Sequence, residues 1–326
     1  MNEWLSPRVL VLAGGLSHER DVSLRSGRRV ADALKDAGCN VDVRDVDEQL
    51  LDVVRSDRID VVWPLLHGAS GEDGAVRDVL ELVGVPYVGS SARSCRLSWS
   101  KPVAKGVARD AGLATPAFVA LPHGTFRELG ASRVLSAIVD RLGLPLVVKP
   151  ASGGSALGAS AVRTADALPR AMVDCFAYGD VALVERHVTG VEVAVSVVEL
   201  PDGPLVLPPV EIAPDGGLYD YDARYTAGAT TFYCPARLTP ETMDAVTTMA
   251  LTAHRAFGLR HVSRTDLIVD PSGQPWFLEV NVAPGMTETS LLPQSVEAAG
   301  LTPGTVYRRL VEAAAGTNRS HSVTLS

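Results

Sequence analysis

SRTDLIVDPSGQPWFLEVN, residues 263–281, has the pattern of a β-hairpin and is the most decisive stretch of the chain. Residues 262–269 are mostly apolar or β-branched and form the first expected strand, and residues 276–281 form the second. Between them, DPSGQ is a run of turn-forming residues. The stretch therefore predicts two antiparallel strands joined by a short loop.

The register of this hairpin brings polar side chains together. A loop of residues 271–274 places Asp270 opposite Pro275, and the remaining pairs follow by counting back along both strands. The polar pairs are Asp266 with Glu279 and Arg264 with Asn281. Because side chains two apart share a face, these four polar groups converge on one side of the ribbon. The other side takes the apolar residues Leu267, Val269, Leu278 and Val280.

The polar face of the hairpin carries two carboxylates and an amide, from Asp266, Glu279 and Asn281. Carboxylates held a few ångströms apart repel one another unless a positive charge sits between them. All-oxygen ligands suit a hard cation such as Mg²⁺, which binds few carboxylates and takes phosphate oxygens as further ligands. This face therefore indicates a metal–nucleotide site. The alternative is a solvated face, but such a face typically carries Lys and Thr instead of clustered acids.

The composition is that of an ordinary globular protein, with 46% hydrophobic and 21% charged residues among 326. This length allows two or three domains with cores of their own. The formal net charge of −8 and the pI near 5.4 argue against sequence-independent binding of nucleic acid, which needs a basic surface. A few cations in a cleft would still suffice to bind phosphates locally.

The cysteines and the apolar segments bear on the compartment. The four cysteines are scattered and form no metal-binding spacing, which is typical of free thiols in a reducing compartment. The first residues lack a signal-peptide pattern, and no apolar run approaches the length of a membrane span. We therefore expect a soluble cytoplasmic protein with neither a membrane nor a nucleic-acid partner.

The first ninety residues alternate between strand and helix patterns. Strands are expected at residues 8–13, 41–43, 59–66 and 86–88. One helix follows the first strand and ends near Gly38, and another covers residues 75–83. Such alternation predicts a parallel-sheet α/β domain.

The rest of the chain also mixes strands and helices. A helix begins near Ser100, which can cap it, and runs to Ala111. Further strands are expected at residues 144–148, 181–185, 192–198 and 205–212. Further helices are expected at residues 240–257 and 305–315, and the polar residues 316–326 are expected to fray.

Two loops in the first ninety residues carry candidate ligand contacts. GGLSHERDVSLRSG, residues 14–27, is a glycine loop that opens a helix, but its Glu19 would repel phosphate and is better matched to an ammonium group. Glu19 could equally complement the helix dipole. LLHGASGEDG, residues 65–74, follows a buried strand, where His67 either meets a ligand or holds its own loop.

Three later motifs suggest nucleotide contacts. VVKPASGGSALG, residues 147–158, could wrap phosphate oxygens with backbone N–H groups, with Lys149 adding a charge, although a surface linker is the alternative. LVERHVTGVEVAV, residues 183–195, offers Glu185 and Glu192 for adenine and ribose, which is a weak signal by itself. YDYDARY, residues 219–225, is either a ligand loop or a packed aromatic turn.

VNVAPGMTETSLLPQ, residues 280–294, continues directly from the acidic hairpin. Gly285 allows the backbone to come close to a ligand. Ser290 precedes a helical pattern, so its hydroxyl and the nearby N–H groups could receive a carboxylate.

Taken in order, these motifs resemble those of the D-alanine–D-alanine ligases of the ATP-grasp superfamily. The resemblance extends from about residue 9 to residue 315 and rests on GGxSxExxVSLxSG, LHGxxGEDG, VKPxxxGSxxG, YDYxxxY, RxD and ExNxxPGMTxxSL. It implies an α/β fold of three domains, the first with a Rossmann-like parallel sheet, and ATP held between the other two. The implied divisions are residues 1–90, 91–184 and 185–316, with a polar tail at 317–326.

The resemblance also implies roles for individual residues. The nucleotide contacts would be Lys101, Lys149, Glu185, Arg186, Val188, Glu192 and Arg224. The metal ligands would be Asp266, Glu279 and Asn281, in agreement with the hairpin count. The catalytic group would be Glu19, Ser155, Tyr225, Arg264 and the backbone at Gly285, where Glu19 receives the first substrate's ammonium. The second substrate would meet Ser290 and Leu291, and His67 would touch a substrate.

Three positions depart from the pattern of the family. Arg224 stands where Lys is usual, which leaves open how the γ-phosphate is held, because Arg is a planar fork and Lys a compact charge. Ala156 replaces a usual Ser in the phosphate loop, and Ser100 replaces a frequent Asp before Lys101.

The implied activity is ATP-dependent ligation of two D-alanines for peptidoglycan, with Mg²⁺, or Mn²⁺ in its place, in a cytoplasmic homodimer. A related ligase acting on D-lactate or another amino acid is one alternative, although Tyr225 favours the dipeptide. A non-catalytic nucleotide-binding regulator is the other alternative.

Overall fold

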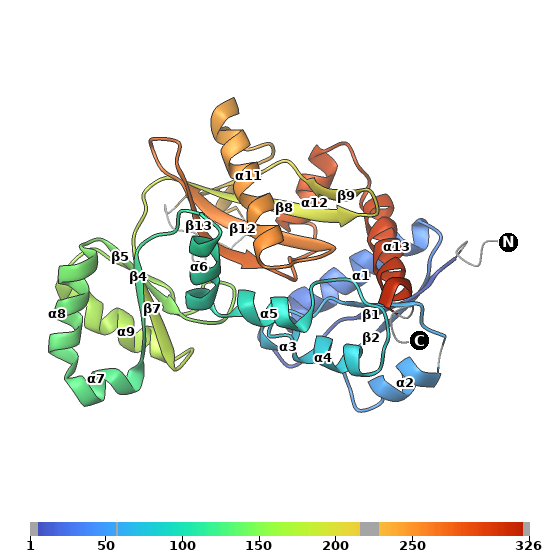
Figure 1. Ribbon diagram of the computed structural model, residues 1–326, viewed down its shortest axis with the longest axis horizontal. Helices are drawn as coiled ribbons and strands as arrows, with labels where there is room; N and C mark the ends of the chain where they lie inside the picture. The colour runs from blue at the N-terminus through green and yellow to red at the C-terminus, as the bar shows by residue number, and fades with distance from the viewer. Residues whose placement is uncertain (1–5, 57, 216–227, 322–326) are drawn as a thin grey trace.

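The chain is arranged around three β-sheets, which Figure 1 shows side by side with helices packed against them. The computed structural model describes residues 6–56, 58–215 and 228–321. None of the helices within these ranges is both long enough and apolar enough to cross a lipid bilayer.

The first sheet is parallel, as the alternating pattern predicted. Its strands β1 (Arg8–Leu12), β2 (Asn40–Arg44) and β3 (Val61–Pro64) lie in the order β2-β1-β3. The strand expected at 86–88 forms only a single bridge, between Val62 and Tyr87. The helices of this part are α1 (Arg20–Asp36), α2 (Leu50–Ser56), α3 (Ala69–Glu72) and α4 (Ala75–Leu82).

The second sheet is antiparallel and occupies the middle of the chain. Its strands are β4 (Phe118–Pro122), β5 (Leu146–Pro150), β6 (Ser160–Val162) and β7 (Val181–Arg186), in the order β4-β7-β5-β6. The helices beside it are α7 (His123–Leu129), α8 (Ala131–Leu142) and α9 (Leu168–Phe176). Their apolar faces form one core with the sheet, in which Ile138, Leu168 and Met172 meet Leu146 and Val184.

The third sheet is antiparallel and contains the hairpin. Its main path is β11-β10-β8-β12-β13, and β9 pairs with β8 beside that path. The strands are β8 (Val191–Leu200), β9 (Gly203–Val206), β10 (Val210–Pro214), β11 (Thr230–Tyr233), β12 (Val262–Val269) and β13 (Pro275–Asn281). The single strand expected at 205–212 is two strands, because Pro208 and Pro209 interrupt it and proline cannot donate to a ladder.

Three helices share the core of the third sheet. They are α5 (Ala92–Trp99), α6 (Lys101–Asp110) and α11 (Pro240–Ala256). In Figure 1, α11 lies across β8 and β12, and Phe257 at its end stacks with Phe277 of β13 at 6.0 Å between ring centroids. Ala104 and Ala108 bring α6 into the same core.

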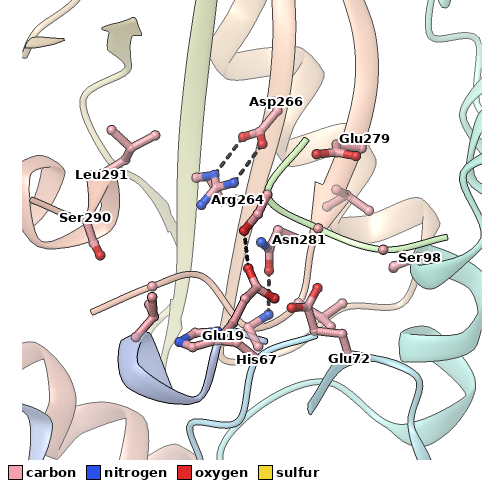
Figure 2. Close-up of a pocket in the computed structure, with 18 of the residues that line it drawn as sticks. Glu19, His67, Glu72, Ser98, Arg264, Asp266, Glu279, Asn281, Ser290 and Leu291 are labelled. Carbon is pink, nitrogen blue, oxygen red and sulfur yellow. Dashed lines mark hydrogen bonds and ion pairs between the residues drawn. The ribbon is translucent and has the colours of Figure 1, made fainter. Parts of the chain in front are cut away.

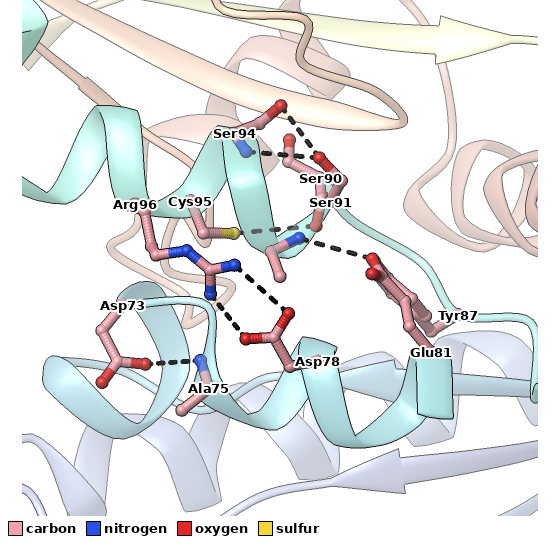
Figure 3. Close-up of polar contacts among 11 residues, drawn as sticks. Asp73, Ala75, Asp78, Glu81, Tyr87, Ser90, Ser91, Ser94, Cys95 and Arg96 are labelled. Atoms are coloured by element: carbon pink, nitrogen blue, oxygen red, sulfur yellow. Dashed lines mark hydrogen bonds and ion pairs between the residues drawn. The ribbon is translucent and has the colours of Figure 1, made fainter. Parts of the chain in front are cut away.

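Helix α5 also ties the N-terminal part to the third sheet. Figure 3 shows Arg96 of α5 in a two-bond ion pair with Asp78 of α4. Ser91 caps α5 by accepting a hydrogen bond from the Ser94 N–H at 3.2 Å. The Ser94 hydroxyl in turn donates to the carbonyl of Gly258 at 2.8 Å. Helix α6 therefore begins from a fixed point at the cleft described below.

The hairpin confirms the expected polar pairs and corrects the turn. Asp266 lies opposite Glu279, and Arg264 opposite Asn281. At the turn, however, Pro275 pairs with Val269 and not with Asp270, so the predicted pairing there is wrong by one residue. A register shift between Asp266 and Leu267 brings the pairs beyond it back to the predicted register.

This β-bulge also changes which side chain of β13 enters the core. Leu278 has no partner in the ladder, because Leu267 pairs with Phe277 and the next pair is Asp266 with Glu279. Phe277 is therefore fully buried beside Leu267, while Leu278 is only partly buried. The expectation that Leu278 joins the apolar face is wrong.

The end of the chain returns to the first sheet. Helix α13 (Pro303–His321) follows α12 (Leu291–Ala298) and packs on α1. Tyr307 meets Trp63 of β3 edge-to-face, at 5.4 Å between ring centroids. The helix is longer than the expected 305–315 and includes residues that were expected to fray, up to His321.

Candidate active site

A cleft opens where the N-terminal loops meet the hairpin and the glycine-rich loop (Figure 2). It collects eleven of the residues that the sequence indicated. They are Glu19, His67, Lys101, Ser155, Arg264, Asp266, Glu279, Asn281, Gly285, Ser290 and Leu291. These residues come from five separate stretches of the chain, so the fold gathers motifs that lie far apart in sequence.

Glu19 and Ser155 join two loops across the cleft. The Ser155 hydroxyl donates a hydrogen bond to the Glu19 carboxylate, although the two residues are 136 positions apart. Ser155 and Ala156 both adopt positive φ, 55° and 56°, which turns the glycine-rich loop sharply at this point. Glu19 stands at the N-cap of α1 without capping it through its side chain. Its carboxylate therefore faces the cleft and remains available to an ammonium group.

His67 forms part of the floor of the cleft. Its imidazole is buried, and its Nε2 lies 3.4 Å from the hydroxyl of Ser26 on α1. That hydroxyl also accepts a hydrogen bond from the N–H of Met286 at 3.1 Å. Burial lowers the pKa of His67, against the raising effect of Glu19, so the ring is neutral at pH 7. His67 thus links its loop to α1 and to residues 283–286 while lining the cleft.

The two hairpin acids are each paired with a cation. Arg264 holds Asp266 through two bonds, Nε to Oδ1 and Nη2 to Oδ2, both 2.7 Å long. Lys101 Nζ lies 3.2 Å from Glu279 Oε2. The amide oxygen of Asn281 accepts a hydrogen bond from the N–H of Ala283 at 2.8 Å. Positive charge therefore stands beside both carboxylates, as repulsion between them requires.

The donor set of the hairpin fits a hard divalent cation. Asp266 and Glu279 are direct cross-strand partners, and Asn281 shares their face, so all three present oxygens. Over the part of the chain that the structure describes, no group of three or more His, Cys, Asp and Glu side chains is arranged to hold a metal. Such an ion would bind Asp266 while that carboxylate is also paired with Arg264. Because this face of the hairpin offers only two carboxylates, the third protein ligand would be the amide oxygen of Asn281.

A buried ionic cluster lies next to the cleft on the side of the second sheet. Glu185 at the end of β7 is bridged by two ammonium groups, with Lys149 Nζ at 2.6 Å from Oε1 and Lys105 Nζ at 2.7 Å from Oε2. Burial by itself would raise the pKa of Glu185, but Lys149 and Lys105 outweigh it and hold that pKa below its usual range. Burial lowers the pKa of Lys105 to about 8.

The remaining nucleotide candidates line neighbouring hollows. Lys101 and Lys149 share a hollow with Glu279 and the loop at 152–157. Arg186 and Val188 line another hollow, together with Trp276. Glu192 lies on β8 opposite Ile212 and Ile268. Lys101 lines the main cleft as well, whereas Lys149, Arg186 and Val188 line only the neighbouring hollows.

Gly285 and Ser290 form the C-terminal wall of the cleft. The Ser290 hydroxyl accepts a hydrogen bond from the N–H of Thr287 at 2.9 Å and lies 2.8 Å from the Thr287 hydroxyl. A Cβ at position 285 would stand 2.7 Å from the Ser290 hydroxyl, so only glycine fits without displacing that group. Leu291 begins α12 directly after Ser290, and both residues line the cleft, so the N-terminus of the helix lies at its edge.

The sequence analysis missed several residues that line the cleft, above all Glu72. Its carboxylate accepts a hydrogen bond from the N–H of Gly68 at 3.0 Å and, in Figure 2, lies beside Glu19 and His67. Burial and the neighbouring charge of Glu19 raise the pKa of Glu72 to about 7. The signal was present, because Glu72 belongs to the same 65–74 motif as His67. Arg25, Ser98, Trp99 and Thr287 were missed as well.

Two of the proposed site residues, Arg224 and Tyr225, lie outside the described residues. Their expected roles remain predictions.

Comparison with known proteins identifies the family of the chain. Residues 107–312 match the family model described as D-ala D-ala ligase C-terminus, and residues 47–90 match D-ala D-ala ligase N-terminus. A D-alanine–D-alanine ligase of Anaeromyxobacter sp. strain K is 40% identical over 315 residues, which cover 97% of this chain and 99% of that protein.

Solved structures of this kind superimpose closely. The VanG D-Ala:D-Ser ligase of Enterococcus faecalis aligns with a TM-score of 0.82 at 27% identity, covering 95% of this chain and 99% of the other. The D-alanine–D-alanine ligase of Bacillus anthracis complexed with ATP aligns with a TM-score of 0.80 at 28% identity, covering 97% and 100%. The fold and the cleft thus define an ATP-grasp enzyme of the ligase class. The chain belongs to the D-alanine–D-alanine ligase family, which confirms the resemblance seen in the sequence.

Proposed function

We propose that this protein joins two D-alanines to D-alanyl-D-alanine at the expense of ATP, for peptidoglycan synthesis. The observation that carries the proposal is the single cleft in which the Glu19–Ser155 pair faces the acidic hairpin. An ammonium-binding carboxylate, a phosphate loop and an acidic hairpin are the parts that a carboxylate–amine ligase needs. Identity of 40% with a D-alanine–D-alanine ligase over nearly the whole chain supports the same substrates.

The first D-alanine would bind with its ammonium at Glu19, whose carboxylate Ser155 orients. Tyr225 would complete this group of residues. The carboxylate of this first D-alanine would then point towards Arg264 and the hairpin. One carboxylate oxygen attacks the γ-phosphorus of ATP, ADP leaves, and an acyl phosphate forms. Carboxylate and amine do not condense unaided in water, and the phosphorylation supplies the leaving group.

The second D-alanine would bind with its carboxylate at Ser290 and the N–H groups that follow it, at Leu291. Its amine, after losing a proton, attacks the acyl carbon to give a tetrahedral centre, and inorganic phosphate leaves as the amide forms. Arg264 and the backbone at Gly285 would stabilise the oxyanion. One such donor is typically worth on the order of 100- to 1000-fold in rate.

The nucleotide would lie in the groove between the second and third sheets. Lys101, Lys149 and Arg224 would meet its phosphates, and Glu185, Arg186 and Val188 its base, with Glu192 at the ribose. Mg²⁺, or Mn²⁺ in its place, held by Asp266, Glu279 and Asn281, would neutralise charge on the phosphates.

Several broader expectations accompany this function. We place the enzyme in the cytoplasm, where ATP is available, and expect a homodimer. We also propose that residues 1–90, 91–184 and 185–316 act as three domains around the cleft, with 317–326 as a tail.

The direct test is to incubate the purified protein with ATP, Mg²⁺ and D-alanine, and to measure ADP and the dipeptide together. Equal amounts of ADP and D-alanyl-D-alanine would support the proposal. If ADP forms only when D-serine or D-lactate is added beside D-alanine, the protein is a related ligase with a different second substrate. The absence of ADP formation with each of these substrates would point to a nucleotide-binding regulator.

A further inference from the structure

Lysine is rare in this chain and is concentrated near the cleft. Of 30 basic residues only four are lysines, namely Lys35, Lys101, Lys105 and Lys149. Lys101 lines the cleft, and Lys105 and Lys149 form the ionic cluster with Glu185 beside it. A chain that uses Arg at almost every other cationic position therefore keeps the compact ammonium group here, where a planar guanidinium would need more space.

Lys105 differs from the other two in that it cannot reach a ligand. Its side chain is 0% exposed, whereas that of Lys149 is 13% exposed and lines a hollow shared with Lys101. The Lys105 ammonium contacts Glu185 and donates to the Thr115 hydroxyl at 2.7 Å. It also lies 5.6 Å from the centre of the Phe118 ring. Lys105 is thus fixed by contacts within the protein.

The cluster carries an uneven charge. Two ammonium groups share one carboxylate, and each takes a separate oxygen of Glu185, so one positive charge is left over. Lys105 is enclosed and Lys149 is not. The remaining positive charge therefore lies at Lys149 and faces the hollow that Lys101 and the glycine-rich loop also line. Without Lys105, both oxygens of Glu185 would be free to pair with Lys149, and the net charge of the cluster would be zero.

The cluster is also connected to the hairpin. The Thr115 hydroxyl, which accepts from Lys105, donates to the carbonyl of Phe277 on β13 at 2.9 Å. Phe277 stands two residues before Glu279 on that strand. Lys105 therefore links β7 of the second sheet to β13 of the third, the two sheets on either side of the groove.

We propose that Lys105 is a positioning residue for phosphate binding, which occupies one oxygen of Glu185 and so leaves the charge of Lys149 for the phosphates of ATP. This inference rests on the proposed nucleotide site and deepens it. The alternative is that Lys105 only fastens the core, in which case its loss would weaken every ligand of the groove alike.

The test compares a ligand that has phosphates with one that lacks them. Isothermal titration calorimetry gives the dissociation constants of ATP and of adenosine for the wild type and for Lys105→Met. We expect the constant for ATP to rise by about tenfold or more and that for adenosine by less than about threefold, because only ATP responds to the lost charge. Lys35→Met, which removes an exposed lysine from α1, is the matched control and should change neither value.

A second substitution that restores the charge separates the loss of charge from a general defect in the core. In Lys105→Met/Glu185→Gln the cluster regains one positive charge, so the ratio of the two dissociation constants should return to that of the wild type. If Lys105→Met fails to fold, the ratio is compared between Glu185→Gln and the double variant. The net charge of the cluster is two in Glu185→Gln and one in the double variant. The dissociation constant of ATP should therefore rise more than that of adenosine from the first to the second.

Equal weakening of ATP and adenosine by Lys105→Met, relative to the wild type, would overturn the inference. An equal ratio in Glu185→Gln and in the double variant would overturn it as well. Failure of the proposed function is distinguishable from this result. A wild type that binds ATP but makes no dipeptide would contradict the ligase assignment and leave the role of Lys105 standing. A wild type that does not bind ATP would contradict both.

Discussion

The carboxylate of Asp266 is held in a two-bond ion pair by Arg264, which stands two residues earlier on the same strand. Residues two apart on a strand share a face, so the pair lies flat along the polar side of the hairpin. A planar guanidinium matches a carboxylate in this way, whereas an ammonium cannot. The proposed stabiliser of the tetrahedral centre and a proposed metal ligand are therefore oriented by each other.

Arg264→Lys should lower kcat/KM for dipeptide formation by on the order of 100- to 1000-fold, because the charge remains but the fork is lost. Steady-state kinetics with D-alanine and ATP measure the change. Arg237→Lys is the matched control, since Arg237 forms a similar two-bond pair with Glu211 and lines none of the hollows described above. Near-normal turnover in Arg264→Lys would remove Arg264 from the mechanism.

Glu279→Gln should abolish most Mg²⁺-dependent turnover while the protein stays folded, because an amide cannot supply the negative charge that a hard cation prefers. Turnover as a function of Mg²⁺ concentration, together with circular dichroism, checks both parts of this prediction. Glu241→Gln removes an exposed carboxylate from the first turn of α11 and serves as the control. An unchanged Mg²⁺ dependence in Glu279→Gln would show the metal assignment to be wrong.

Glu19→Ala should raise the KM for the first D-alanine much more than the KM for ATP, because the carboxylate faces the cleft where an ammonium group would bind. Ser155→Ala, which removes the hydrogen bond to Glu19, should move the same constant in the same direction by less. Initial rates at varied D-alanine and varied ATP separate the two constants. Equal increases in both would contradict the assigned role.

The sequence predicted the polar face of the hairpin although it misplaced the turn. A face is set by alternation, so Asp266, Glu279 and their neighbours had to stand together in any register that keeps the polar side intact. The bulge at Leu278 could not be foreseen, because it depends on Phe277 entering the core beside Leu267. The strand expected at 205–212 failed for a local reason, because Pro208 and Pro209 divide it and both are visible in the sequence.

The sequence could not predict contacts between distant elements. Lys105, Lys149 and Glu185 lie on three elements, and no local pattern joins them. Glu72 was not predicted for another reason, since the segment has the pattern of a ligand loop, whereas residues 69–72 form the short helix α3. The local motifs indicated single candidates such as Glu19, His67 and Lys149, and the resemblance to a family assigned them their roles and added the rest.

The raised pKa of Glu72 predicts that the stability of the protein depends on pH. This pKa is raised from 4.5 to about 7, chiefly by burial and then by the charge of Glu19. An acid with a raised pKa binds its proton more tightly in the folded state, so between pH 4.5 and 7 the folded protein holds more protons than the unfolded chain. The contribution of Glu72 to stability is therefore present at low pH and is lost as pH rises through 7.

Glu72→Gln should remove this loss, because the amide stays neutral at every pH. Relative to the wild type, the variant should gain stability on the order of 1–3 kcal/mol between pH 5 and pH 8. Urea unfolding at several pH values, without nucleotide or divalent cation, gives the free energies of unfolding, and the difference between the two proteins isolates Glu72 from other titrating groups. Glu128→Gln, at an exposed position of α7, should give a curve parallel to that of the wild type. If the curve for Glu72→Gln is parallel as well, the carboxylate of Glu72 is already charged at pH 5 and does not hold a proton in the cleft.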